Sequence, residues 1–143
     1  MRSTARVILG GLALLLAGGA VFAMTRPGGD ATSLEHASWV LTATSASSFD
    51  PATVAITAAF TDTQISGSSG VNRYSGGCTT SSDGDFSVGE LISTLMAGPE
   101  PDMQAEATYL ELLASVTAYT VDGDQLILRD AEGNDQLTFA AAE

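Results

Sequence analysis

The sequence Gly-Val-Asn-Arg-Tyr-Ser-Gly at residues 70–76 is the most informative part of this chain, together with Thr-Leu-Met-Ala-Gly at residues 94–98. Glycine adopts backbone conformations that other residues avoid, and asparagine tolerates left-handed geometry while bonding neighbouring amides. We therefore predict that Asn72 shapes a turn and that Gly70 and Gly76 are structural. A short strand is expected over residues 71–75, after a turn at residues 67–70.

Several short strands are predicted around this stretch. Residues 38–41 open the fold, and residues 53–61 alternate as a half-buried strand does. The side chains expected on its buried face are Val54, Ile56, Ala58 and Phe60. Farther on, Asp83-Gly84 separates residues 78–82 from residues 85–88 in the manner of a hairpin.

One helix is predicted in the second half of the chain. Pro99 and Pro101 end the preceding segment, and Asp102 is a plausible N-cap for a helix over residues 103–116. Its expected apolar positions are 103, 107, 110, 113 and 114. Three strands follow, joined by tight turns at residues 122–123 and 132–134.

These elements predict a single small α+β domain, a curled and mostly antiparallel β-sheet with one packed α-helix. One segment of roughly a hundred residues can bury one core and no more. The expected core residues are Trp39, Ile56, Phe60, Phe86, Leu110, Leu113, Leu126, Leu128 and Phe139.

This order of motifs resembles the META-domain family, which includes the HslJ-like heat-shock proteins of bacterial envelopes. The resemblance covers residues 38–139 and includes the tryptophan strand, the Gly-x-Asn-x-x-x-Gly turn, the Thr-x-Met-Ala segment and the helix with an early glutamate. The family carries two cysteines where this chain has Val71 and Gly98. The loss of both implies that they form a disulfide in relatives, and it argues against a cysteine-dependent role here.

The N-terminus predicts export. Arg2 and Arg6 precede an uncharged apolar run over residues 7–25, which nearly reaches the ~20 residues that span a bilayer. Small residues around Ala23 suit a signal peptidase, so residues 1–23 are either a cleaved signal peptide or an uncleaved membrane anchor. Any membrane association is expected through residues 7–25 only. Residues 24–36 are predicted to be a flexible tether and residues 37–143 the META-like domain.

The charge of the exported part excludes nucleic acid as a partner. Beyond Ala23 the chain has seventeen acidic residues against three arginines and no lysine, which gives a net charge of −14. Contacts to phosphate backbones depend on clustered lysine and arginine, and this chain has no such cluster.

No catalytic constellation is present in the sequence, so we do not expect an enzyme, a cofactor or a metal site. His36 is the only histidine and lies at the junction of the tether and the domain, and Cys78 is the only cysteine. We interpret Cys78 as a small core residue, with a reactive thiol or an intermolecular bridge as alternatives. The acidic turns at 83–85, 122–124 and 130–135 do not have EF-hand spacing, and ordinary turn chemistry explains them.

The candidate binding residues are Asn72, Arg73 and Tyr74, because Arg73 is the only arginine between Arg26 and Arg129 and lies inside the motif. Glu106 falls on the apolar stripe of the predicted helix, where an unpaired carboxylate would be costly. We therefore expect backbone amides or Arg73 to hold Glu106 as a structural tie between helix and sheet.

Three functional hypotheses follow. The resemblance implies a non-catalytic, stress-related envelope protein, exported or membrane-anchored, that binds an unidentified protein or small-molecule ligand. The alternative is a secreted inhibitor or interaction module, for which an exposed apolar patch near Tyr74 or Tyr119 would be the diagnostic feature. The third is a carboxylate-dependent hydrolase, which requires two acidic groups facing one cleft roughly 5 to 10 Å apart.

Overall fold

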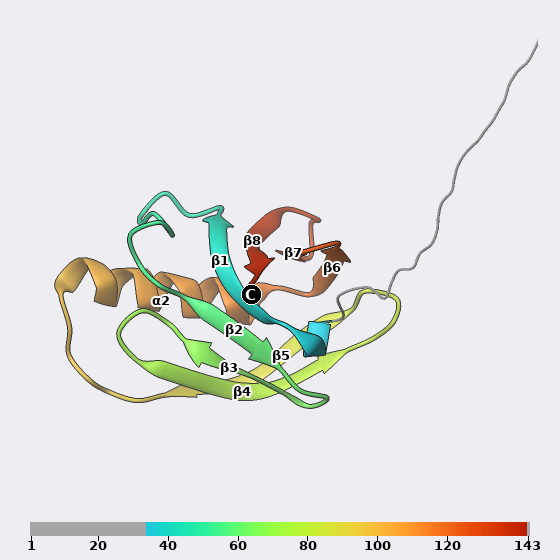
Figure 1. Ribbon diagram of the computed structural model, residues 1–143, viewed down its shortest axis with the longest axis horizontal. Helices are drawn as coiled ribbons and strands as arrows, with labels where there is room; N and C mark the ends of the chain where they lie inside the picture. Colours follow the sequence, from blue (N-terminus) through green and yellow to red (C-terminus); the bar gives the residue numbers. More distant parts are fainter. Residues whose placement is uncertain (1–33, 143) are drawn as a thin grey trace, which may run out of the picture. The chain divides into compact units, whose positions relative to one another are not determined.

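The computed structural model describes residues 34–142 (Figure 1). The predicted signal or anchor segment and residues 24–33 of the predicted tether lie outside the described residues. The description begins with a short 3-10 helix, η2 (Leu34–His36). Leu34 is buried, and its carbonyl accepts a hydrogen bond from the Trp39 indole at 3.0 Å. No helix within the described part of the chain is long and apolar enough to cross a membrane.

Eight antiparallel strands form one sheet in the order β5-β4-β3-β2-β1-β8-β7-β6. Their bounds are β1 (Ser38–Thr44), β2 (Thr57–Phe60), β3 (Gln64–Ser68), β4 (Arg73–Thr80), β5 (Phe86–Ser93), β6 (Ala118–Asp122), β7 (Gln125–Arg129) and β8 (Asp135–Ala141). The sheet curls until its two edge strands meet at one end, where the Phe86 amide donates to the Thr117 carbonyl at 3.0 Å. The predicted curled sheet with one helix is confirmed.

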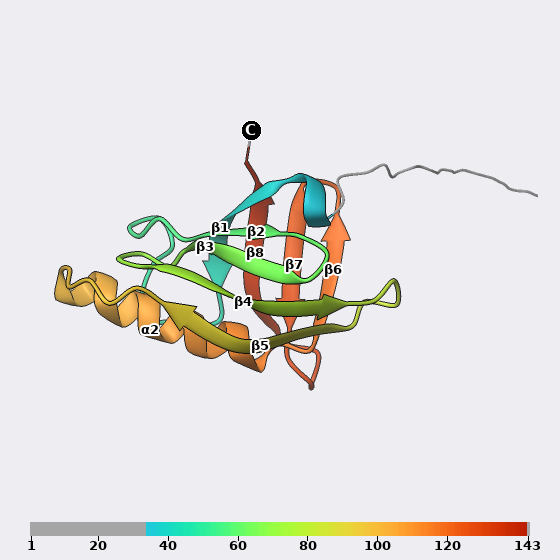
Figure 2. The same cartoon turned by 90° about the horizontal axis from the view of Figure 1, so that it is seen from below.

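The helix α2 (Glu100–Ser115) packs against β5 and β8 (Figure 2). It begins at Glu100 and has Pro99 as its N-cap, so the predicted N-cap at Asp102 and helix start at residue 103 are wrong. The reason is that Pro101 falls in the first turn, where the missing amide proton has no partner in any case.

The buried face of α2 also differs from the predicted stripe. The helix buries Ala105, Glu106, Tyr109 and Leu113. Met103 is 41% exposed, and Leu110 is only partly buried against the core. Each of the other predicted core residues is buried.

The strand expected over residues 53–61 is shorter than predicted, since β2 begins only at Thr57. Its predicted facing is confirmed, because Val54, Ile56, Ala58 and Phe60 are all buried. The strand expected over residues 71–75 begins at Arg73, after a turn in which the Ser69 amide donates to the Asn72 carbonyl at 2.8 Å.

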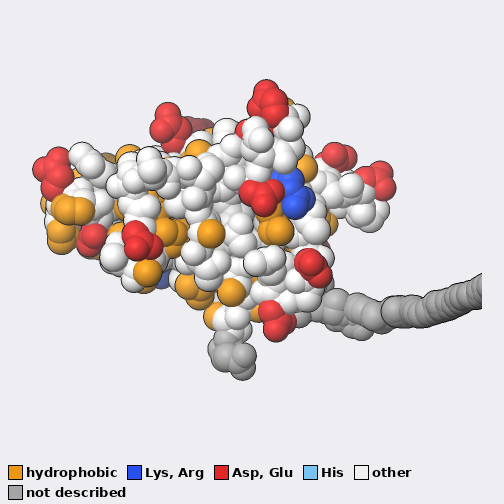
Figure 3. All heavy atoms as spheres, turned by 90° about the horizontal axis from the view of Figure 1, so that it is seen from above, with side chains coloured by type: hydrophobic (Ala, Val, Ile, Leu, Met, Phe, Trp, Pro, Cys, Tyr) orange, Lys and Arg blue, Asp and Glu red, His pale blue; other side chains and the backbone are white. Residues whose placement is uncertain are grey.

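The surface of the domain is strongly acidic. Figure 3 shows carboxylates scattered over the visible face, whereas basic side chains occupy only small spots. Within residues 34–142 the single ion pair joins Arg129 Nε to Asp135 Oδ1 at 2.7 Å. Arg73 therefore has no carboxylate partner among the described residues.

Candidate functional site

Glu106 lies at the centre of the contact between α2 and the turn formed by residues 69–72, which we call the motif turn. Its Oε1 atom is 2.7 Å from the Asn72 amide, 3.2 Å from the Val71 amide and 2.8 Å from the Ser69 hydroxyl. The Asn72 side-chain amide donates to Oε2 at 2.8 Å. Backbone amides therefore hold Glu106, as one of the two predicted alternatives stated. The other alternative, an ion pair between Glu106 and Arg73, is wrong.

These hydrogen bonds govern the ionisation of Glu106, which is about nine-tenths buried. Burial alone would raise the pKa of this carboxyl by penalising its charge. The donors from Asn72, Ser69 and Val71 together outweigh that effect and hold the pKa below its ordinary value. Glu106 is therefore an anion held by fixed dipoles at neutral pH.

Asn72 uses all four of its side-chain hydrogen-bonding positions within the fold. Its Nδ2 atom donates to Glu106 and also to the Met96 carbonyl, at 3.2 Å. Its Oδ1 atom accepts from the Thr94 hydroxyl at 2.8 Å and from the Met96 amide at 2.6 Å. The asparagine thus joins the two motif stretches, and no position on its side chain is left for a ligand.

Gly70 and Gly76 are both required by the local backbone. Gly70 has a φ of 120°, a value that residues with side chains rarely adopt. At Gly76 an added Cβ would lie 2.9 Å from the Glu90 carbonyl oxygen on the neighbouring strand β5. A side chain at either position would disturb the turn or the pairing of β4 with β5.

Tyr74 points into the core rather than outward. Its hydroxyl lies 2.7 Å from the Tyr109 hydroxyl and donates to the Thr57 carbonyl at 2.8 Å. Burial raises the pKa values of both tyrosines, so both hydroxyls stay protonated. Of the candidate binding residues, only Arg73 presents a side chain that is free of internal bonds.

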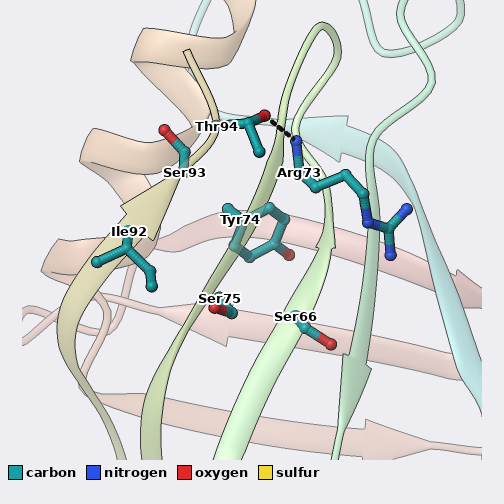
Figure 4. A pocket seen from close by; sticks show the side chains of 7 residues that line it. All are labelled: Ser66, Arg73, Tyr74, Ser75, Ile92, Ser93 and Thr94. Carbon is teal, nitrogen blue, oxygen red and sulfur yellow. Dashed lines mark hydrogen bonds between the residues drawn. The ribbon is translucent and has the colours of Figure 1, made fainter. Parts of the chain in front are cut away.

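Arg73 borders a shallow hollow of about 340 Å³ on the outer face of the sheet, the Arg73 hollow. Ser66, Ser75 and Ile92 stand in register across β3, β4 and β5 and form its floor. Figure 4 shows the Arg73 side chain on one side of this floor and Ile92 on the other. Tyr74, Ser93 and Thr94 complete the lining. Ser93 pairs with the core-facing Tyr74, so the hydroxyls of the floor beside Arg73 are those of Ser66 and Ser75.

Exposed apolar side chains also lie at the start of α2 and in the segment just before it. We define the apolar patch as Leu95, Met96 and Met103, whose exposed fractions are 94%, 58% and 41%; Ile92 is also exposed but borders the Arg73 hollow instead. A second hollow of about 220 Å³, the methionine hollow, is lined by Leu95, Met96 and Met103 among others. The sequence analysis missed this patch, although the run Leu95-Met96 just before Pro99 was a signal for it.

The two positions of the family cysteines are adjacent in space. A Cβ built on Gly98 would lie 3.4 Å from the Val71 Cβ and closer still to the Val71 methyl groups. Disulfides join Cβ atoms about 3.5–4.5 Å apart. This proximity agrees with the pairing that the resemblance implies for relatives, and Val71 now fills the space beside Gly98.

The Cys78 thiol and the last acidic turn, which the sequence left as possible reactive or metal-binding groups, have structural roles in the fold. Burial raises the pKa of the Cys78 thiol to about 11, so its reactive thiolate is scarce at neutral pH. In the last acidic turn, Asp130 accepts bonds from the amides of Glu132 and Asn134, as in an ordinary turn. Within residues 34–142 no group of three acidic, histidine or cysteine residues is placed to hold a metal ion.

The fold and the site define a small α+β domain whose curled antiparallel sheet is bonded to its helix through one buried glutamate. Residues 32–143 match the META domain, and the chain belongs to the META-domain family. No curated protein matches the chain.

The solved structures similar to this chain include two determined by NMR. The NMR structure of a protein from Burkholderia xenovorans is 28% identical, with a TM-score of 0.58 over 76% of this chain and 83% of the other. A second NMR structure is 24% identical, with a TM-score of 0.52 over 75% of this chain and 90% of the other. At this level of identity, the second similarity shows only that the two proteins share a fold.

Proposed function

We propose that this chain is an exported, non-catalytic binding protein of the cell envelope, and that its contact surface is the Arg73 hollow with the apolar patch. The observation that carries the proposal is the patch, because three large apolar side chains are exposed around one hollow. Such groups in soluble proteins mark sites of association. The basic residues and apolar run of the N-terminus support export or anchoring in the envelope.

The way in which the patch is held supports a binding role. Asn72 bonds both polar backbone groups of Met96, so Leu95 and Met96 are displayed from a segment fixed to the sheet. A preorganised surface loses less conformational entropy on association than a mobile one. The hydrogen bonds of Asn72 and Glu106 thus support binding by holding this segment in place.

A secreted inhibitor or interaction module is the second candidate. Ser93 lines the methionine hollow together with the apolar patch and pairs with Tyr74 in the sheet, so the patch lies near one of the two tyrosines where a protein-binding surface was predicted. A carboxylate-dependent hydrolase has less support. The Arg73 hollow contains no carboxylate, and the methionine hollow contains only Glu106, whose oxygens already accept hydrogen bonds.

Site-specific crosslinking in the native envelope tests the proposal. A photo-crosslinking amino acid replaces Leu95 in the full chain, and a matched protein carries it at Glu132, an exposed turn position. Adducts that form from position 95 and not from position 132 are expected. Identical adducts from both positions, or none from either, would remove the apolar patch as the contact surface.

A further inference from the structure

The end of β5 and the segment that follows it present a continuous run of exposed residues, from Ile92 to Ala97. Leu95 lies within this run and is 94% exposed, so nearly the whole of its side chain is in contact with water. A side chain in this position can enter a pocket of another protein without any rearrangement of its own domain. The burial of its apolar surface would then favour association.

The backbone of this segment stays extended beyond the end of β5. The Thr94 amide donates to the Arg73 carbonyl at 3.0 Å, so the pairing with β4 continues past Ser93. The side-chain amide of Asn72 then takes the place of a neighbouring strand. Its Oδ1 atom accepts from the Met96 amide at 2.6 Å, and its Nδ2 atom donates to the Met96 carbonyl at 3.2 Å. The Thr94 amide and both backbone groups of Met96 therefore face the sheet.

The residues in alternate positions have backbone groups that face the opposite side. Successive residues of an extended chain direct their amides and carbonyls to opposite sides, so Ser93 and Leu95 direct theirs away from β4. At this end of β5, no strand within residues 34–142 lies on that side. An open edge of this kind can accept an extended strand from another protein.

A serine endopeptidase is a partner that would recognise both features of this segment. Such an enzyme holds an extended chain across its active site and receives one side chain in a specificity pocket beside the catalytic serine. In chymotrypsin that pocket is an apolar slot. Leu95 has the size and the apolar character that such a slot accepts. Ser93, two residues before it, has an amide and a carbonyl that can pair with a strand of the enzyme.

The hydrogen bonds on both sides of the Leu95–Met96 peptide favour an inhibitor over a substrate. When the serine oxygen of the enzyme adds to the Leu95 carbonyl carbon, the bond to the Met96 nitrogen breaks, and that nitrogen takes the proton that the catalytic histidine removed from the serine. The new Met96 amine can stay on Asn72 Oδ1, which also accepts from the Thr94 hydroxyl at 2.8 Å. Both ends of the broken peptide thus remain side by side, which favours reformation of the bond over release.

We propose that residues 92–97 form an inhibitory loop for serine endopeptidases that cleave after large apolar residues, with Leu95 in the specificity pocket and Leu95–Met96 as the reactive peptide. The proposal rests on the proposed binding function, in which Leu95 belongs to the contact surface, and it names the class of the partner. Leu95 should supply most of the affinity, because a few anchor side chains in pockets dominate the energy of such interfaces.

Inhibition of chymotrypsin and trypsin by the full chain in a nonionic detergent tests the proposal. The trypsin pocket contains an aspartate that selects basic side chains, whereas the chymotrypsin pocket is apolar. We expect competitive inhibition of chymotrypsin, a loss of about thirtyfold or more in Leu95→Asp, and transfer of the inhibition to trypsin in Leu95→Lys. Ala131→Lys introduces the same charge at a separate exposed turn and should inhibit both enzymes as the parent does.

The hold on the broken peptide has its own variant. Thr94→Val removes the hydroxyl that joins this residue to Asn72 and to the Arg73 amide, and it leaves Leu95 in place (Figure 4). Chymotrypsin should cleave this variant after Leu95 at least about fivefold faster than the parent, the effect of one lost hydrogen bond. Mass spectrometry of the fragments measures the rate, and a thermal melt checks that the variant is folded.

Three results would overturn the proposal. Rapid and complete cleavage of the parent between Leu95 and Met96 would make the loop a substrate. Inhibition that survives Leu95→Asp would place the contact elsewhere. If the parent did not inhibit chymotrypsin and Leu95→Lys did not inhibit trypsin, the protease class would be excluded. Adducts from position 95 in the envelope would then leave the proposed binding function standing with a partner of another kind.

Discussion

Replacement of Glu106 by glutamine tests the tie between α2 and the motif turn. The substitution keeps the shape of the side chain and removes its charge. One oxygen remains to accept from Ser69, Val71 and Asn72, but a neutral acceptor forms weaker bonds than a carboxylate. The new amide group replaces the oxygen that faces Asn72 Nδ2 at 2.8 Å, so two donors meet.

Rotation of Asn72 does not relieve this conflict. Its Oδ1 atom accepts from Thr94 and from the Met96 amide, and a flipped side chain would present donors to those donors instead. A charge-assisted hydrogen bond contributes about 1.5–3 kcal/mol, and a buried donor without a partner costs about 1–3 kcal/mol. We expect Glu106→Gln to lower the free energy of unfolding by about 2 to 4 kcal/mol.

Urea denaturation of the unit that contains the whole core, residues 24–143, measures this loss by circular dichroism. For a domain of roughly a hundred residues, this loss in the free energy of unfolding corresponds to a fall in Tm on the order of 10 °C. Glu111→Gln is the matched control, because Glu111 is exposed on the same helix and its loss should stay within about 0.5 kcal/mol. If both variants unfold at the same urea concentration, the hydrogen bonds to Glu106 do not stabilise the fold.

Three further predictions follow from particular residues. Because the pKa of Glu106 is lowered in the folded state, its stabilisation is complete above the ordinary value of 4.5 and is lost as pH falls through the folded value. The difference in stability between the parent and Glu106→Gln should therefore shrink in acid melts below about pH 4.5; a constant difference would contradict the assignment. The double variant Val71→Cys with Gly98→Cys should form a disulfide and gain about 2–4 kcal/mol when oxidised, and a count of three free thiols after unfolding would show that it does not. Phe60→Ala should cost about 3–5 kcal/mol, because the ring is buried beside Phe86, and a loss below about 1 kcal/mol would contradict that packing.

Local patterns in the sequence predicted the sheet well. Strict alternation placed Ile56 and Phe60 on the buried face, and Asp-Gly pairs marked the hairpins before β5 and before β7. β5 was predicted only as far as Val88. Gly89 and Glu90 break its alternation, and the ladder shifts register there through a bulge opposite Gly77.

The helix face was predicted less well, because apolar periodicity takes no account of distant hydrogen-bond partners. Tyr109 is buried with its hydroxyl against Tyr74, thirty-five residues away in sequence. Glu106 was identified correctly as a carboxylate that needed donors, but which donors depends on how the turn folds. The Arg73 hollow depends on the register of three strands, which one sequence does not reveal.

The sheet order also determines when the domain can finish folding. β1 lies between β2 and β8, so the first strand of the domain pairs with the last, about a hundred residues later. Pairing between segments so distant in sequence is slow, because closing the long intervening loop costs entropy before any contact forms. While the final strand is still unsynthesised, β1 lacks one neighbour and the sheet remains in two pieces. A chain exported as proposed would thus stay loosely folded during passage through a secretion channel and close its sheet only after the C-terminus arrives on the far side.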